Sequence, residues 1–260
     1  MNRAPLTRSA LRVTLAVAAI IALVPAPSAA QFDTRPSLGI QTMLFNGDNQ
    51  ARRPISQGTD VMLAFGGGLS SANNGIRFGL EVVPDPEGVL RFPIVAEYYW
   101  FDGKTTFAVP SNNRRVQQLR LHYTANMFSG GLGVTASFFN KAVASLYFSA
   151  EGRFNYFPST TLTSRRFYLD NGELIGAERS ITPDTEARTR IGAVIRMGTQ
   201  ADFFDPVLLD FTIGYGALNL GMKDTDPETQ RDLLTAEPTL NTAERTLGFI
   251  TFGLSAIWRF

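Results

Sequence analysis

Apolar and polar residues alternate along most of the chain after residue 31. An alternation with a period of two is typical of β-strands, because successive side chains of a strand point to opposite faces of the sheet. The pattern recurs in seven segments, which begin at Ile76, Leu90, Leu119, Ala144, Ile191, Leu209 and Ile250. The pattern therefore predicts an all-β protein.

Two all-β architectures alternate in this way, the soluble sandwich and the membrane-spanning barrel. The segments run to ten residues or more, whereas sandwich strands have about 5–6 and a tilted membrane strand needs about 9–11. The connections are short at Asn140-Lys141 and Asp205-Pro206 but long and polar at 46–57, 158–188 and 220–244. Aromatic residues collect near the segment ends: Tyr98, Trp100, Tyr156, Phe203, Tyr215, Trp258 and Phe260. These features favour a closed antiparallel transmembrane up-and-down β-barrel.

We expect about ten strands, an even number as bacterial single-chain barrels require. The expected segments are 37–45, 59–69, 76–83, 90–101, 104–109, 116–139, 142–168, 173–203, 207–220 and 246–260. If 102–115 is a single loop, the count is eight. Asp170-Asn171-Gly172 is a hairpin-turn signal. It predicts that two strands extend past the membrane and meet at a tip outside. A short helix is expected near 228–235, after a capping-box pattern.

Residues 1–30 have the pattern of a cleaved secretory signal peptide. Three arginines precede an apolar run at 15–24, and Ser28 and Ala30 are small residues at the positions that a signal peptidase reads. An N-terminal membrane anchor is the alternative, but the run is shorter than the roughly 20 residues that span a bilayer. Cleavage would leave 31–260 as the barrel domain. It would also change the net charge from +1 to −2, with 21 basic and 23 acidic residues.

Composition excludes several kinds of site. The absence of Cys excludes disulfides, thiolate nucleophiles and Cys-ligated metals, and a single His excludes a multi-His metal site. We therefore expect no metal and no cofactor. A net charge near zero argues against nucleic-acid binding. The mean hydropathy of −0.01 is what results when alternate residues face lipid and a polar interior.

The chain ends in FITFGLSAIWRF, an alternating segment with a terminal aromatic. This end resembles the C-terminal strand of bacterial outer-membrane proteins, and the whole chain resembles the small OmpA/OmpX/OmpW-like barrels of Gram-negative bacteria. The resemblance implies that Phe252, Leu254, Trp258 and Phe260 form a signal read by the barrel-assembly machinery. It also implies an outer-membrane location, contact with outer-membrane lipid and lipopolysaccharide, and a structural or surface-interaction role. The ligand of the long outer loops is not indicated.

The face opposite the apolar one carries charges of both signs. The expected lumen set is Asp60, Arg77, Glu81, Arg91, Glu97, Arg120, Glu151, Arg153, Arg190, Arg196, Asp210 and Arg259. Unpaired buried charge is costly, so in a narrow lumen these groups should pair across strands and plug it. The alternative is the charged constriction of a narrow pore or small-molecule channel.

A lipid A-modifying enzyme is the third hypothesis, and it depends on His122, Thr124 and Asn126. The stretch HYTAN faintly resembles the His-x-Ser-Asn arrangement of outer-membrane lipid A deacylases, but Thr replaces Ser and the Asn is displaced by one position. No acidic residue neighbours His122 in sequence, which argues against a protease of the omptin kind. We expect polar lumen residues here and no enzyme.

Overall fold

The fold is taken from a computed structural model, in which compact unit 33–260 is described separately from residues 1–32. The structure describes 32–46, 55–56, 64–65, 69–70, 72–84, 87–109, 115–140, 144–158, 160–170, 173–184, 187–224, 233–234 and 244–259. The predicted signal peptide with Ser28 and Ala30, the lumen candidate Asp60 and the terminal Phe260 lie outside these residues, as does nearly all of the expected helix at 228–235.

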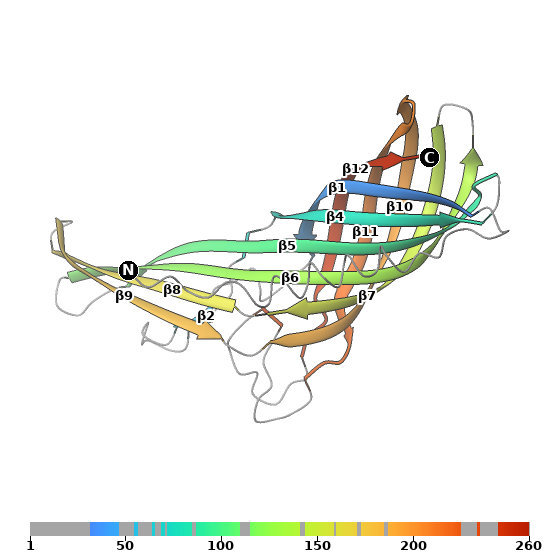
Figure 1. The fold of residues 1–260 in the computed structure, drawn as a ribbon. Coiled ribbons are helices and arrows are strands. Elements are labelled where there is room, and N and C mark those ends of the chain that lie inside the picture. The colour runs from blue at the N-terminus through green and yellow to red at the C-terminus, as the bar shows by residue number, and fades with distance from the viewer. Residues whose placement is uncertain are drawn as a thin grey trace, which may run out of the picture. The chain divides into compact units, whose positions relative to one another are not determined.

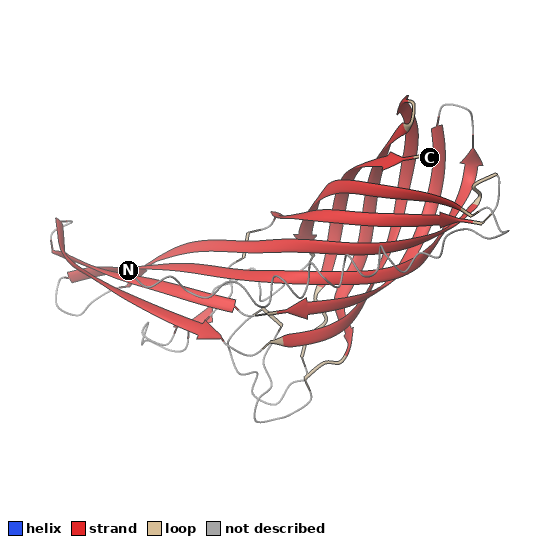
Figure 2. Ribbon diagram, in the orientation of Figure 1, coloured by secondary structure: helices blue, strands red, loops and turns tan. Residues whose placement is uncertain are grey.

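The regular elements of the described residues are all strands (Figures 1 and 2). Within the part of the chain that the structure describes, no helix is long and apolar enough to cross a membrane. The strands are β1 (Asp33–Phe45), β2 (Ile55–Ser56), β3 (Ala64–Phe65), β4 (Ala72–Val83), β5 (Leu90–Val109), β6 (Arg115–Asn140), β7 (Ala144–Phe157), β8 (Thr160–Asp170), β9 (Glu173–Asp184), β10 (Arg188–Phe204), β11 (Val207–Gly221) and β12 (Gly248–Trp258).

Ten of these strands form one antiparallel sheet, in agreement with the predicted number. Eight of them, β1, β4, β5, β6, β7, β10, β11 and β12, pair in chain order, and β12 returns to pair with β1, where Leu254 lies opposite Ile40. This pairing closes an up-and-down barrel ring of eight, the smaller of the two expected counts. β2 and β3 form a separate short pair.

The other two sheet strands, β8 and β9, belong to an extension beyond one end of the ring. β8 pairs with the first half of β6, and β9 pairs with β8 (Figure 1). β8 and β9 form an antiparallel hairpin in which Asp170 pairs with Glu173, as the turn signal predicted. The expected segment 104–109 is not a separate strand, because β5 continues through it to pair with β6. The expected segments 142–168 and 173–203 are each divided in two, near Pro158 and near residue 187.

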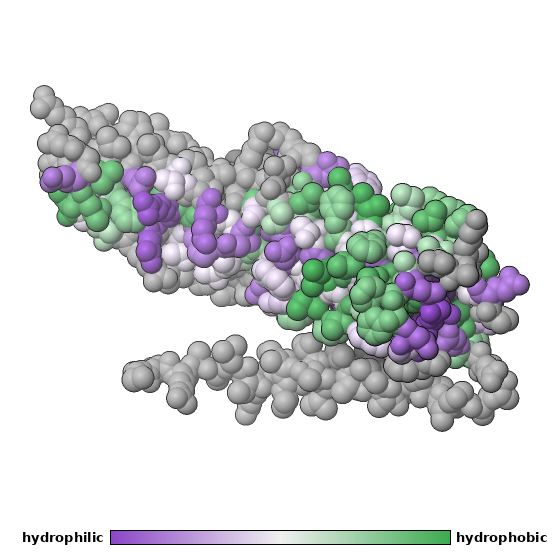
Figure 3. Space-filling model, turned by 90° about the horizontal axis from the view of Figure 1, so that it is seen from above, coloured by the Kyte–Doolittle hydropathy of each residue, from purple (hydrophilic) through white to green (hydrophobic). Residues whose placement is uncertain are grey.

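The outward face of the ring is apolar. Figure 3 shows green, apolar side chains over much of the barrel part of this face, with purple groups along the extension and at the far end of the barrel. The exposed large apolar residues of this belt include Leu38, Ile40, Phe78, Phe92, Ile94, Leu132, Val134, Phe148, Phe154, Ile195, Met197, Phe211, Ile213, Phe252 and Leu254. At its edge toward the extension, the Tyr98 ring lies 5.9 Å from that of Trp100 and 4.8 Å from that of Phe128. An apolar belt edged by aromatics is the lipid-facing surface of a transmembrane barrel.

β6 reverses its polarity where it leaves the belt, which corrects one prediction. The expected lipid-facing residues Leu119, Leu121, Tyr123 and Met127 are buried, between 1% and 4% exposed. Arg120, Thr124 and Asn126 instead lie exposed on the outward face, and His122 shares that face with a side chain 43% exposed. Even-numbered residues point outward from Arg120 up to the register shift between Ser137 and Phe139, as Phe128 and Leu132 do within the belt. Beyond the belt water replaces lipid, so the polar side chains face outward and the apolar ones face inward.

The buried apolar side chains form one cluster toward the extension end of the ring. It includes Met43, Phe45, Tyr99, Phe101, Tyr123, Met127, Phe157, Leu218, Leu233, Leu234, Leu247 and Phe249. The Phe45 and Phe101 rings stack with centroids 5.5 Å apart. Leu233, Leu234 and Leu247 come from the connection before β12. This connection therefore contributes to the core.

Candidate functional site

The middle of the barrel holds a compact group of charges from four strands. Arg77 comes from β4, Glu97 from β5, Glu151 and Arg153 from β7, and Arg196 from β10. Each residue takes the inward position of its strand, and the Glu97, Arg153 and Arg196 side chains are at most 4% exposed. Three guanidinium groups thus surround two carboxylates in an interior from which water is largely excluded. We call these five residues the central cluster.

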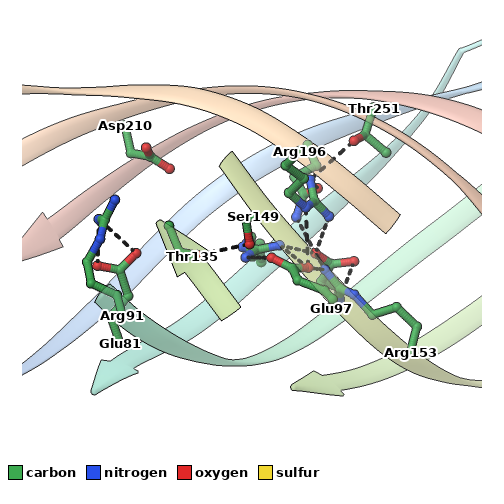
Figure 4. Close-up of polar contacts among 12 residues, drawn as sticks. Glu81, Arg91, Glu97, Thr135, Ser149, Arg153, Arg196, Asp210 and Thr251 are labelled. Carbon is green, nitrogen blue, oxygen red and sulfur yellow. Dashed lines mark hydrogen bonds and ion pairs between the residues drawn. The ribbon is translucent and has the colours of Figure 1, made fainter. Parts of the chain in front are cut away.

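Every member of the central cluster is paired. Glu97 lies 2.8 Å from Arg77, 3.0 Å from Arg153 and 3.2 Å from Arg196. Glu151 lies 2.8 Å from Arg77 and 3.3 Å from Arg196, and it also pairs with Arg153. Arg153 and Arg196 both point toward Glu97 in Figure 4. Sharing each carboxylate among three arginines satisfies charges that would otherwise be costly to bury.

Neutral polar groups complete the cluster. The Gln41 amide donates to Glu97 over 2.6 Å, and its oxygen accepts hydrogen bonds from Tyr99 (3.1 Å) and Arg196 (3.0 Å). A glycine makes room for Arg153, because a Cβ at Gly131 would lie 2.6 Å from the Arg153 Cδ. Gly198 likewise makes room for a large neighbour, because a Cβ there would collide with the Tyr147 ring.

A second charged group lies nearer the turn end of the barrel. Arg91 lies 3.1 Å from Glu81, and its guanidinium carbon lies 4.7 Å from the centre of the Tyr147 ring. The Tyr147 hydroxyl donates to Asp210 over 2.7 Å, and Gln200 donates to Glu81 over 3.3 Å. Figure 4 shows the Arg91–Glu81 pair apart from the central cluster. Thr135 and Ser149 lie between this pair and the cluster.

A cavity of about 20 Å³ lies between the two charged groups, lined by residues of both, including Arg77, Glu81, Glu151, Arg196 and Asp210. A volume of about 10–15 Å³ accommodates one water molecule. The central cluster has one more arginine than carboxylates, and the second group has one more carboxylate than arginines. The formal charges of the two groups therefore balance across this cavity.

A separate buried ion pair, Arg190–Glu244, lies toward the extension end of the ring. Glu244, whose side chain is fully buried, lies 2.5 Å from Arg190 and accepts hydrogen bonds from Asn219 (2.5 Å) and from the backbone amide of Asp224 (3.1 Å). Asn219 also accepts a hydrogen bond from the Leu247 amide over 2.7 Å. These contacts attach both ends of the connection between β11 and β12 to the barrel wall.

Most of the predicted lumen residues point inward, but two do not. The structure places these inward: Arg77, Glu81, Arg91, Glu97, Glu151, Arg153, Arg190, Arg196 and Asp210. Arg120 is on the outward face of the extension, because beyond the apolar belt this face contacts water. Arg259 is 41% exposed and pairs with Asp202 over 2.8 Å, because it lies beyond the last residue of β12.

Three kinds of lumen residue were missed by the sequence analysis. Gln41 and Asn155 are buried neutral amides at inward strand positions, where the alternation could have identified them. Tyr147 is buried at an inward strand position, and its hydrogen bond to Asp210 had no signal in the sequence. Glu244 lies in a polar connection with no periodic pattern, so nothing in the sequence indicated its burial. Of the predicted assembly signal, Phe252 and Leu254 are exposed on the belt and Trp258 is half-buried.

His122 has an acidic partner that its sequence neighbours did not reveal. Its Nε2 pairs with the Asp102 carboxylate of β5, and Lys104 lies 3.5 Å from the same carboxylate. The pair is on the exposed outward face of the extension rather than in the lumen. Thr124 lies opposite Asp102 on this face. Within the described residues, no group of three or more acidic or His side chains could hold a metal ion.

The pKa of Asp102 is lowered from its ordinary value of 3.8. Partial burial opposes the shift, but the hydrogen bond and charge of His122 and the charge of Lys104 outweigh it. Because folding favours the charged carboxylate, the pair stabilises the extension at pH values above 3.8. This contribution is lost as the pH falls through the lowered pKa.

We expect His122→Gln to return the pKa of Asp102 toward 3.8, because the substitution removes the charge of His122. Carbon-detected NMR of the Asp102 carboxyl, titrated in detergent micelles, measures this shift. Thr124→Ser, on the same face but outside the ion pair, is the control. An Asp102 titration unchanged by His122→Gln would contradict the pairing.

No protein-family model matches the chain, and no curated protein matches it. Solved structures give matches of low similarity. Neisserial surface protein A is 12% identical, covering 87% of this chain and 97% of its own, with a TM-score of 0.43. Ail, the attachment invasion locus protein of Yersinia pestis, is 11% identical (88% and 99% covered, TM-score 0.36), and the outer membrane protease OmpT of Escherichia coli is 10% identical (91% and 99%, TM-score 0.33). At these values the similarity defines no activity, and the barrel architecture follows from this chain's own strand pairing.

Proposed function

We propose that this chain is an integral outer-membrane barrel with a closed lumen, whose extension and loops provide a surface for interaction outside the cell. The main support for a closed lumen is that the buried charged side chains pair with one another. In the central cluster, three arginines and two glutamates contact one another across the barrel. A water-filled pore would leave such groups lining an open path.

The number of strands in the ring supports the same conclusion. A barrel of about eight strands has an interior just wide enough for side chains, whereas aqueous channels belong to barrels of about 16–18 strands. Here the charged groups occupy the middle and the turn end of the barrel, and the apolar cluster with Phe45, Phe101 and Phe249 occupies the other end. The cavity of about 20 Å³ between the charged groups accommodates about one water molecule. A narrow pore remains the alternative that the experiment below tests.

The proposed location rests on the surface of the barrel. The apolar belt with its aromatic edge suits a bilayer, and a strand barrel of this kind is the form that bacterial outer membranes hold. Its partners there are outer-membrane lipid and lipopolysaccharide along the belt, and the barrel-assembly machinery during insertion. An enzymatic role is not proposed, because His122 and Asp102 are on an open sheet face from which water is not excluded.

Planar-bilayer recording tests the closed lumen. We expect the purified, refolded chain to give no discrete conductance steps, because the paired charges leave no continuous path for ions. Insertion is checked in parallel by heat-modifiable gel migration of the same reconstituted sample, and a trimeric porin serves as the positive control.

The variant Arg153→Ala separates a pore from a leak through damaged bilayer. Discrete steps from the unmodified chain that change size in Arg153→Ala would show that ions pass the central cluster, and would overturn the closed lumen. A chain that stays monomeric and folded without detergent would overturn the membrane barrel itself.

A further inference from the structure

Three arginines occupy one row across the extension. The register places Arg120 of β6 opposite Arg165 of β8, and Arg165 opposite Arg179 of β9. Directly opposite residues of neighbouring strands share a face of the sheet. Arg120 and Arg165 are both exposed on the outward face.

Such a row is unfavourable without a counter-charge. Like charges directly opposite one another destabilise a strand pair. Arg120 and Arg165 are both exposed on the same face, so an external anion would compensate the repulsion between them.

The surroundings of the row hold one of its arginines in place. Between Trp100 and the row, the charged and titratable side chains described on this face are Asp102, Lys104 and His122. Asp102 already pairs with both Lys104 and His122. Arg120 donates to Gln118 over 3.2 Å, and its guanidinium carbon lies 4.6 Å from the centre of the Phe167 ring. A guanidinium stacked on a ring presents its remaining N–H groups in a fixed fork that suits phosphate.

The height of the row above the belt indicates which phosphate would reach it. Thr106 of β5 lies opposite Arg120, six residues beyond Trp100. At about 3.3 Å per residue and a strand tilt of about 40°, the row is roughly 15 Å above the aromatic edge. It is on the same outward face as the belt, so the headgroup of a lipid standing against β5 and β6 extends along it.

We propose that Arg120 and Arg165, with Lys104 beside them, bind phosphate groups on the sugar headgroup of a glycolipid in the surrounding outer leaflet. This inference rests on the proposed function, since it requires the extension to stand outside the membrane. The bound headgroup offsets the repulsion within the row and fixes the extension against its own membrane.

The test uses the full chain in detergent micelles, in phosphate-free buffer at low ionic strength. The probes are lipopolysaccharide with its phosphates and the same lipopolysaccharide after enzymatic dephosphorylation. The double variant Arg120→Gln/Arg165→Gln is compared with Arg166→Gln, an arginine of the same strand on the other face. Binding is measured by microscale thermophoresis and stability by thermal melting.

We expect the double variant to bind phosphorylated lipopolysaccharide at least about tenfold more weakly, a loss of about 1.4 kcal/mol or more. Dephosphorylation should weaken binding to the unmodified chain similarly, and Arg166→Gln should bind as the unmodified chain does. Without the glycolipid, the double variant should melt at a higher temperature, because the repulsion is gone. With the glycolipid, only chains that keep the row should gain stability.

Equal binding by the double variant, or an equal loss in Arg166→Gln, would overturn the proposal. Tighter binding to a soluble sulfated polysaccharide than to the glycolipid would overturn the assignment to the membrane's own lipid. The proposed function is tested by different results, namely conductance steps or folding without detergent. Neither of these results affects the comparison of binding between the arginine variants.

Discussion

Replacement of Glu97 by glutamine is expected to destabilise the barrel by about 3–5 kcal/mol, the usual cost of removing one partner from a buried ion pair. Glu97 contacts Arg77, Arg153 and Arg196 and accepts a hydrogen bond from Gln41. Without its charge, three buried guanidinium groups would share the single carboxylate of Glu151. The substitution keeps the size of the side chain, so the loss reports charge rather than a cavity.

Urea unfolding of the barrel in lipid vesicles, followed by Trp fluorescence, measures the change. Asp202→Asn is the matched control, because Asp202 forms one ion pair with Arg259 and both side chains are more than 40% exposed. Exposed pairs contribute about 0–1 kcal/mol. A second removal, Arg153→Met in the Glu97→Gln background, should restore part of the stability by removing the excess charge. Equal effects of Glu97→Gln and Asp202→Asn would contradict the dependence on buried pairing.

The lumen residues could be predicted where lipid defines the outer face. Within the belt the outward positions are apolar, so the alternation identifies the inward ones, and Arg77, Glu97 and Arg196 were assigned correctly. The alternation itself only separates two faces and does not say which one is inside. In the first half of β6 the outer medium is water, so Arg120 and His122 were assigned to the wrong face although the strand itself was predicted.

The strand count shows a similar limit. The hairpin of β8 and β9, in which Asp170 pairs with Glu173, could be predicted because its sequence signal is local, whereas the division of the long segments near Pro158 depends on which strand lies alongside. β7 pairs with both β6 and β10, but β8 beyond it pairs with β6 and β9. The closed ring also determines which residues meet in the lumen. Arg196 and Gln41, for example, form a hydrogen bond although they are 155 residues apart in the sequence.

Nothing in the sequence indicated that Glu244 is buried. Its replacement by glutamine should nevertheless have the second large effect, which is to open the connection before β12. Its side chain is fully buried and accepts hydrogen bonds from Arg190, Asn219 and the Asp224 amide. Loss of its charge leaves Arg190 buried without its carboxylate. Hydrogen bonds to charged groups contribute about 1.5–3 kcal/mol each, so the open form of the connection before β12 should rise in population by about tenfold or more.

Limited trypsin digestion of the reconstituted chain measures this opening, because Lys223 and Arg245 flank the connection that Glu244 attaches. In Glu244→Gln, cleavage after these two residues should become faster while the barrel band in heat-modifiable gels persists, since the central cluster is intact. Glu173→Gln, an exposed carboxylate at the tip of the extension, should leave the cleavage rate unchanged. A rate in Glu244→Gln equal to that of Glu173→Gln would mean that the apolar contacts of Leu233, Leu234 and Leu247 hold the connection without the ion pair.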